Sequence, residues 1–378
     1  MIKNNYLYLD NAATTKPNPE VVALYNKIET EYFGNASSIH ALGVQSFSLE
    51  NKAKESILKT LNLKKYKVIF TSSATEANNL AIKGYCYKFR NRGNHLITSC
   101  VEHPSVLEVF HQLEKDGFRV TYLPVDEFGR VNVHNLEKSI TKETILVSIM
   151  STNNEVGTLN DLSSIAQLLH QFPKIVFHSD TTQSIGKDLI NFNNLDMFVI
   201  SAHKIHGLKG SGCLIMKDNI ELSPVINGGG QEYGLRSGTV AVSQAVALAK
   251  ALQIAYAKIS ANSTLISEIN QQITVKLANN DGIKINSNKY CSPYILNFSL
   301  TKKKASVVVE ALSNKLIFVS SVSACNSKGE KSSYVVAGMT GNEEYAANTI
   351  RLSFDEECTL EKADIFVSTL FNILEEIR

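Results

Sequence analysis

The sequence places a lysine directly after a short apolar run, in Ser201-Ala202-His203-Lys204 following Met197–Ile200. The run predicts a buried strand, so Lys204 is expected at the carboxyl end of that strand, where open α/β sheets bind ligands. A lysine whose pKa is lowered by its surroundings can form a Schiff base with an aldehyde. Most lysines are solvated surface charges, so this segment alone does not assign a Schiff-base role to Lys204. Other segments of the chain must carry groups that suit the same ligand.

An acidic residue is expected at a neighbouring strand end. Asp180 follows the apolar run Ile175–His178 and precedes Lys204 by 24 residues, a spacing that fits one crossover and one strand. A carboxylate at this position can hydrogen-bond a pyridinium nitrogen and keep it protonated, which makes the ring an electron sink. The alternative is an ordinary helix-capping or turn aspartate.

Two more strand ends carry groups that suit the same ligand. The segment Ser72–Asn79 follows the predicted strand Lys67–Thr71 and opens a helix. Small hydroxyl residues at a helix N-terminus favour a phosphate, although an ordinary helix cap is an equal alternative. His103 follows the predicted strand His95–Ser99. A flat imidazole there can stack on a pyridine ring and relay protons. The alternative is a loop histidine whose hydrogen bonds serve only the local structure.

A fifth strand end completes the set. Asn154 follows the predicted strand Ile145–Met150 and can donate to a ring oxygen of a cofactor. Five strand ends thus direct polar groups to one rim of a sheet. Their convergence predicts a pyridoxal-phosphate site at that rim.

The bulk properties limit the other function classes. The chain has 378 residues, 44% of them hydrophobic and 20% charged, with a net charge of +2. These values are typical of a globular protein of two domains and do not favour direct binding to nucleic acid or to a membrane. No apolar run approaches the roughly 18 residues that span a bilayer. Met1–Asp10 lacks the apolar core of a signal peptide, so we expect a cytoplasmic protein.

The cysteines are dispersed and contain no Cys-x-x-Cys pair. A disulfide scaffold is therefore not expected in a chain of this size and location.

The order of predicted elements indicates an α/β fold with a mostly parallel, seven-stranded sheet. The five strands already named are joined by Arg119–Leu123 and Gly212–Met216, with helices at Thr75–Lys83, Ser105–Lys115 and Asp161–Phe172. A long helix, Val240–Lys258, leads into a smaller α/β unit with strands Pro293–Leu300, Ile317–Val322 and Thr349–Phe354 and helices Ala305–Lys315 and Leu360–Glu376. We assign residues 15–257 to a large domain and residues 1–14 and 258–378 to a small one.

The chain resembles a known family over nearly its whole length. It is similar to the class V branch of fold-type-I pyridoxal-phosphate enzymes, and within it to the cysteine desulfurases of the NifS/IscS type. The matching segments are Tyr8–Thr15, Phe33–Ser38 with His40, Ser73–Asn79, Thr98–His103, Asn153–Gly157, Asp180–Ser184, Ser201–Lys204, Gly228–Glu232, Arg236–Thr239, Ser323–Cys325 and Ile350–Ser353.

The resemblance implies a role for each matching residue. Lys204 carries the cofactor as a Schiff base and later moves protons, while Asp180 pairs with the pyridinium nitrogen. The other implied cofactor contacts are Gln183 to the phenolic oxygen, His103 by stacking, Asn154, and the phosphate ligands Thr75 with the Ala74 backbone, Ser201 and His203. Asn154 and Arg351 grip the substrate carboxylate, and Thr239 reaches the phosphate of the neighbouring subunit, which implies a homodimer. No metal site is expected.

Cys325 turns the general pyridoxal prediction into one of sulfur transfer. It lies in the small, polar stretch Ser323–Ser333, which predicts a mobile loop, whereas a structural cysteine such as Cys213 lies in an apolar run. Lys328 and Lys331 favour the thiolate form. The predicted reaction takes L-cysteine to L-alanine and leaves a persulfide on Cys325, which passes to a sulfur-acceptor protein. The alternative for this thiol is an exposed bystander.

Several departures from the family pattern concern local loops. Asn227 stands where the family usually has histidine, Leu208 replaces a frequent proline, and Ser73 replaces a frequent glycine. The short segment after the last helix favours a partner in tRNA thiolation over an iron–sulfur scaffold. The alternatives are a selenocysteine lyase or other β-lyase of this fold, a non-catalytic sulfur-pathway subunit, and a metal protein built on His203 and His206.

Overall fold

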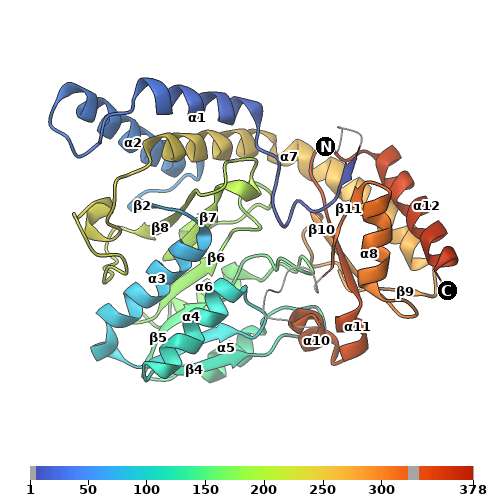
Figure 1. Ribbon diagram of the computed structural model, residues 1–378. Coiled ribbons are helices and arrows are strands. Elements are labelled where there is room, and N and C mark those ends of the chain that lie inside the picture. Colours follow the sequence, from blue (N-terminus) through green and yellow to red (C-terminus); the bar gives the residue numbers. More distant parts are fainter. Residues whose placement is uncertain (1–5, 322–331, 378) are drawn as a thin grey trace.

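The large sheet of the molecule has seven strands. The computed structural model describes residues 6–321 and 332–377 (Figure 1). The strands lie in the order β2-β8-β7-β6-β5-β3-β4. Their bounds are β2 Tyr66–Thr71, β3 His95–Ser99, β4 Arg119–Leu123, β5 Thr144–Ser148, β6 Val176–Asp180, β7 Met197–Ser201 and β8 Gly212–Lys217. Only β8 runs antiparallel to its neighbours, which confirms the mostly parallel sheet.

Alternation along the strands explains why helices cover both faces of this sheet. On β7, Phe198 faces one apolar cluster and Val199 faces another. The Val199 face is covered by α3 (Ala74–Lys88) and α4 (Pro104–Lys115). The Phe198 face is covered by α2 (Ala41–Thr60), α6 (Leu162–Leu169) and α7 (Val242–Ala278). Burial on both faces makes the central strands read as continuous apolar runs, as parallel strands do.

Two helices near the N-terminus were not predicted from the sequence. They are α1 (Pro19–Glu31), capped by Asn18, and α2 (Ala41–Thr60), capped by His40. Both lie along the first part of α7 at one side of the molecule (Figure 1). Large parts of both helices are exposed, so the apolar periodicity that would indicate them is weak.

A second, four-stranded sheet has the order β12-β13-β10-β9. Its strands are β9 Ile283–Ile285, β10 Ile295–Leu300, β12 Ser320–Ser321 and β13 Thr349–Ser353, covered by α8 (Ala305–Asn314) and α12 (Leu360–Glu376). The predicted strand 317–322 is instead divided into β11 (Ile317–Phe318) and β12, because β11 pairs with the N-terminal β1 (Leu7–Tyr8) and β12 pairs with β13. Two short helices, α10 (Tyr334–Thr340) and α11 (Glu343–Ala347), precede β13, and α5 (Val133–Ser139) and α6 (Leu162–Leu169) complete the helices described.

The long helix α7 (Val242–Ala278) joins the two sheets (Figure 1). Its first half buries Leu248 and Leu252 against the large sheet, and its second half buries Ile266 and Ile273 against the small one. The helix is 37 residues long and extends well past the predicted end at Lys258. Among the described helices, none combines the length and the apolar run needed to cross a membrane.

Candidate active site

A cavity of about 360 Å³ lies at the carboxyl ends of the parallel strands. Five different strand ends contribute to it, as the sequence predicted. Of the predicted site residues, the cavity is lined by Ala74, Thr75, His103, Asn154, Asp180, Gln183, Ser201, His203, Lys204 and Arg351. Thr239 is exposed and does not line the cavity of its own chain. Cys325 lies outside the described residues.

Lys204 follows β7 directly, and its ammonium-bearing end is turned back toward the N-terminal segment. Its Nζ donates to the carbonyl oxygens of Ala12 at 2.5 Å and Ala13 at 2.7 Å. Burial, followed by the charges of Lys187 and Arg351, lowers the pKa of Lys204 to about 7. A neutral amine has two hydrogens for the two carbonyls and a free lone pair, which suits attack on an aldehyde.

Asp180, at the end of β6, is held by two donors. Its Oδ2 accepts from Asn78 Nδ2 at 2.9 Å, and its Oδ1 accepts from the Thr182 backbone N–H at 3.0 Å. Asn78 Nδ2 also donates to Ser105 Oγ, which lies 2.9 Å from the Nδ1 atom of His103. A continuous chain of hydrogen bonds therefore joins the carboxylate to the imidazole.

The same contacts set the tautomer of His103. Its Nδ1 accepts from the backbone N–H of Ser105 at 3.1 Å. Burial lowers the pKa of His103, with Asp180 opposing the shift, so the neutral ring carries its proton on Nε2. The ring can therefore offer a donor at its free edge.

The phosphate cradle is the N-terminus of α3. Ser73 caps the helix by accepting from Glu76 N at 3.2 Å, so serine fills the position where the family pattern often has glycine. The Glu76 carboxylate binds Ser72 N at 2.8 Å and Arg236 Nε at 2.7 Å, which fixes the turn before the helix. Gly212 on β8 allows the Ser73 backbone to lie close to this strand, because a Cβ at position 212 would lie 2.8 Å from the Ser73 carbonyl carbon.

The opposite wall comes from β13 and the segment after β5. Arg351 is 7% exposed and donates to Asp10 Oδ1 and to the Asn154 carbonyl oxygen, at 2.8 and 2.9 Å. In the described part of the chain, Arg351 Nε and Asn154 Oδ1 are buried without a hydrogen-bond partner. We call Asn154 and Arg351 the substrate wall, and Lys204, Asp180, Gln183 and His103 the strand-end wall.

These groups fit pyridoxal phosphate. The N-terminus of α3 suits its phosphate, Asp180 suits its pyridinium nitrogen, and Lys204 suits its aldehyde. The unpartnered Thr182 hydroxyl, among the described residues, offers one more buried contact. Sequence reasoning missed Asn78, Ser105 and Asp10 as site residues. Asn78 and Asp10 lie inside matching segments, and Ser105 lies two residues after one.

Comparison with known proteins also supports a pyridoxal-phosphate site. The model of the aminotransferase class-V family matches residues 7–366. The chain belongs to this family. It is therefore a pyridoxal-phosphate enzyme, and the resemblance to the NifS/IscS group is confirmed.

Relatives of known sequence or structure cover almost the full chain. A "NifS/IcsS protein homolog" from Lactobacillus delbrueckii subsp. bulgaricus is 39% identical over 98% of this chain and 97% of its own length. "Cysteine desulfurase IscS" from Clostridium botulinum is 36% identical over 99% of this chain and 96% of its own length. A solved "NIFS-LIKE PROTEIN" superposes with a TM-score of 0.91 at 32% identity, covering 98% of this chain and 99% of its own.

Proposed function

We propose that the chain is a cysteine desulfurase that converts L-cysteine into L-alanine and transfers the sulfur to Cys325. The observation that carries the proposal is a single cavity with Lys204 on one wall and, on the other, the buried Arg351, whose Nε has no hydrogen-bond partner among the described residues. The names of the relatives support cysteine as the substrate.

Pyridoxal phosphate supplies the electron sink that stabilises negative charge at the substrate Cα. In the proposed roles, Arg351 and Asn154 bind the substrate carboxylate, because a guanidinium fork matches a carboxylate bidentately. Lys204, once released, accepts the Cα proton, since its pKa of about 7 leaves much of the amine neutral near neutral pH. Asp180 would hydrogen-bond the ring nitrogen of the bound cofactor, and His103 would offer its Nε2–H.

We propose that the sulfur is then transferred to Cys325. The Cys325 thiolate attacks the substrate sulfur, and the Cβ–S bond breaks with its electron pair on carbon. The carbon takes up a proton to give alanine, and Cys325 keeps the sulfur as a persulfide. Ser333, close after Cys325 in sequence, hydrogen-bonds the Glu155 carboxylate at 2.5 Å next to Asn154. This contact supports delivery of the Cys325 segment to the substrate wall.

Two variants and a matched control test the proposal. Lys204→Ala is expected to abolish alanine formation from cysteine. Cys325→Ser is expected to bind cofactor normally and to carry no protein-bound persulfide. Cys291→Ser, which changes another thiol that is only partly buried, is the control and should behave as the parent protein. Normal sulfur transfer to acceptors by Cys325→Ser would exclude the assignment.

We propose that the acceptor serves tRNA thiolation or iron–sulfur cluster assembly. The IscS name of a relative supports a sulfur-supplying role without distinguishing the two routes. Transfer of labelled sulfur from the loaded enzyme to a tRNA thiolase and to an iron–sulfur scaffold, measured in parallel, separates them. The cytoplasmic location is a further prediction from the sequence.

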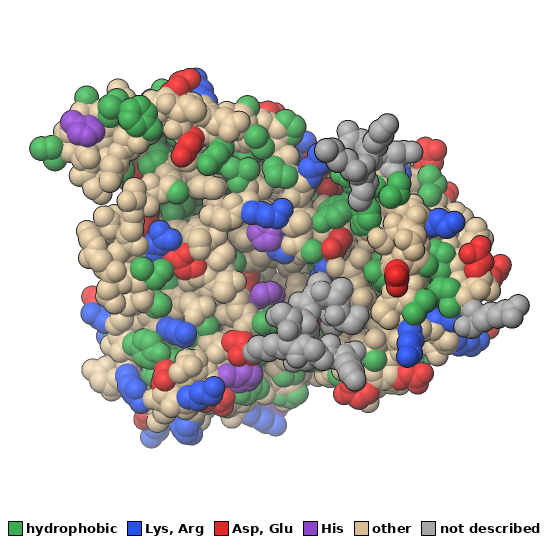
Figure 2. Space-filling model, viewed as in Figure 1, with side chains coloured by type: hydrophobic (Ala, Val, Ile, Leu, Met, Phe, Trp, Pro, Cys, Tyr) green, Lys and Arg blue, Asp and Glu red, His purple; other side chains and the backbone are tan. Residues whose placement is uncertain are grey.

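We also propose a homodimer, together with the domain division at residues 15–257 and 1–14 with 258–378. Apolar side chains gather on the lobe formed by α1, α2 and their connection (Figure 2), where Phe33 is 73% and Ile39 98% exposed. A second copy covering this lobe would remove that surface from water and bring Thr239 to the partner's cavity. Sedimentation at the monomer mass would contradict the proposal.

Pairing of β1 with β11 supports the inclusion of residues 1–14 in the small domain.

A further inference from the structure

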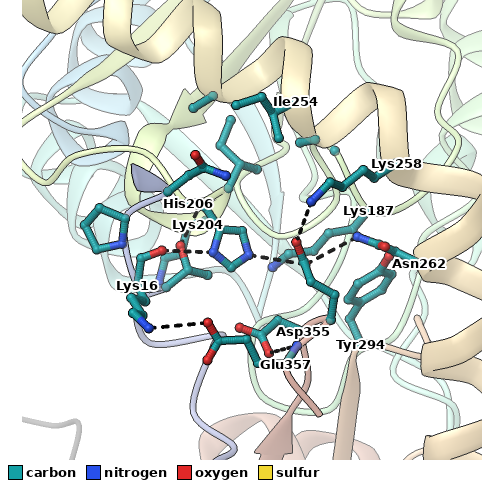
Figure 3. Close-up of a pocket in the computed structure, with 18 of the residues that line it drawn as sticks. Lys16, Lys187, Lys204, His206, Ile254, Lys258, Asn262, Tyr294, Asp355 and Glu357 are labelled. Carbon is teal, nitrogen blue, oxygen red and sulfur yellow. Dashed lines mark hydrogen bonds and ion pairs between the residues drawn. The ribbon is translucent and has the colours of Figure 1, made fainter. Parts of the chain in front are cut away.

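A second cavity, of about 170 Å³, shares Lys204 with the candidate active site. Figure 3 shows its lining, which comes from the N-terminal segment, α7 and the turn after β13. Most of its charged side chains are paired: Glu356 binds His206 and Lys258, and Lys16 binds Glu357. Two described cations of this cavity, Lys187 and Lys204, form no ion pair with a carboxylate, and Lys204 binds backbone carbonyl oxygens instead.

The neighbours of Lys187 do not neutralise it. Asp188 follows it directly, but the Asp188 carboxylate accepts instead from Ser292 Oγ at 2.8 Å and Thr152 Oγ1 at 3.3 Å. The ring of Tyr294 lies 6.0 Å from Lys187 Nζ. Burial lowers the pKa of Lys187 to about 8, with Asp188 opposing the shift. Because no described carboxylate pairs with Lys187, its positive charge acts on the polar and charged groups beside it.

Among the described residues, Lys187 Nζ makes one hydrogen bond, and it leads into the active site. Its Nζ donates to Gln183 Oε1 at 3.5 Å, and Gln183 Nε2 donates to the Ala12 carbonyl oxygen at 3.0 Å. The same carbonyl accepts from Lys204 Nζ. Because an ammonium can only donate, it requires the amide oxygen on its own side and leaves the NH₂ group facing the active site. Lys187 and the Ala12 carbonyl thereby favour the same orientation of the Gln183 amide.

We propose that Lys187 is a positioning residue of the active site, which orients the Gln183 amide and uses its charge to disfavour a second positive charge on Lys204. The inference rests on the proposed function, since it gives Lys187 a part in the chemistry of that same site. Lysine suits this task because its compact charge sits within reach of the amide while its stem lies along the cavity wall.

The charges around both lysines set the sign of the effect. Lys187 and Arg351 lower the affinity of Lys204 for a proton, and Asp10 and Asp180 raise it. The charged or titratable neighbours of the pair also include His103, His203, Asp188 and Asp355. Of the two cations, Lys187 has the larger influence on Lys204. Removing the charge of Lys187 must therefore make the Lys204 nitrogen easier to protonate.

The test is a pH titration of the cofactor's visible absorbance in the holoenzyme, which reports protonation at the Lys204 nitrogen. Lys187→Met is expected to raise the midpoint by about one pH unit, a tenfold change in proton affinity. Lys187→Arg keeps the charge and should keep the midpoint at or below that of the parent protein. Lys258→Met is the matched control, because Lys258 lines the same cavity but is paired with Glu356; its midpoint should not move.

An unchanged or lowered midpoint in Lys187→Met, or an equal rise in Lys258→Met, would overturn the inference. If Lys187→Met does not fold, Lys187→Gln removes the same charge with a polar side chain and must show the same rise. Failure of the proposed function is distinguishable, because the parent protein would then make no alanine from cysteine. A parent protein that makes alanine and a Lys187→Met midpoint that stays in place would reject only the role of Lys187.

Discussion

The strand-end wall and the substrate wall differ in how far their polar groups are already hydrogen-bonded. On the strand-end wall, Asp180, Gln183 and His103 each bind groups of the protein. On the substrate wall, Arg351 Nε and Asn154 Oδ1 are buried without partners in the described part of the chain. A wall whose groups are fixed beforehand suits a resident cofactor, and a wall with unused capacity suits a ligand that comes and goes.

The largest effect is expected from removing charge on the strand-end wall. Asp180→Asn keeps the size of the side chain but loses the carboxylate that faces the ring nitrogen. We expect kcat to fall about 10²- to 10⁴-fold, the range for a group that acts in the transition state. Steady-state alanine formation measures it, with cofactor content as the control. A loss confined to KM would assign Asp180 to the substrate wall instead.

The substrate wall is tested by Arg351→Lys, which keeps a charge and loses the bidentate fork. We expect kcat/KM for cysteine to fall about 10- to 100-fold, mainly through KM, because one charge-assisted hydrogen bond is lost. The absorbance of bound cofactor should be unchanged. An altered absorbance with a normal KM would mean that Arg351 serves the cofactor rather than the substrate.

Lys204 of the strand-end wall also predicts how the rate of the reaction depends on pH. Lys204 accepts the Cα proton only as a neutral amine, and its pKa is lowered to about 7. Below that value the amine is charged, so kcat is expected to fall about tenfold for each unit of decreasing pH. The pH profile of kcat measures this acid limb. A rate that stays flat from about pH 8 to pH 6 would exclude Lys204 as the base.

The smallest effect is expected from the support of the strand-end wall. Asn78→Ala removes the link between Asp180 and Ser105 without touching the substrate wall. We expect a fall in kcat of about three- to tenfold, the value of one ordinary intramolecular hydrogen bond, with little change in KM. Asn79→Ala, which changes an exposed neighbouring hydrogen bond on the same helix, is the control. Equal losses in both variants would point to α3 as a whole.

The sequence predicted the strand-end wall better than its surroundings. Strands β3, β4 and β7 begin and end where expected, because continuous apolar runs followed by polar residues indicate buried parallel strands. Each residue of this wall follows such a run, so its place at the rim could be inferred locally. The N-cap role of Ser73 was equally local, since it depends on residues three positions apart.

The support of the substrate wall could not be read in the same way. Arg351 meets Asp10 across 341 residues of chain. This contact depends on how the small sheet is placed by α7 and by the pairing of β1 with β11. The helices α1 and α2 were missed because much of their surface is exposed, which hides the apolar stripe of a packed helix.

The central claim is that this cavity carries pyridoxal phosphate on Lys204. Reduction of the holoenzyme with borohydride fixes the cofactor to the lysine that bears it, and mass spectrometry of the digested protein locates it. We expect the cofactor mass on the peptide containing Lys204 and none on the peptide containing Lys187. Attachment at Lys187 or at any other lysine, with Lys204 unmodified, would contradict it.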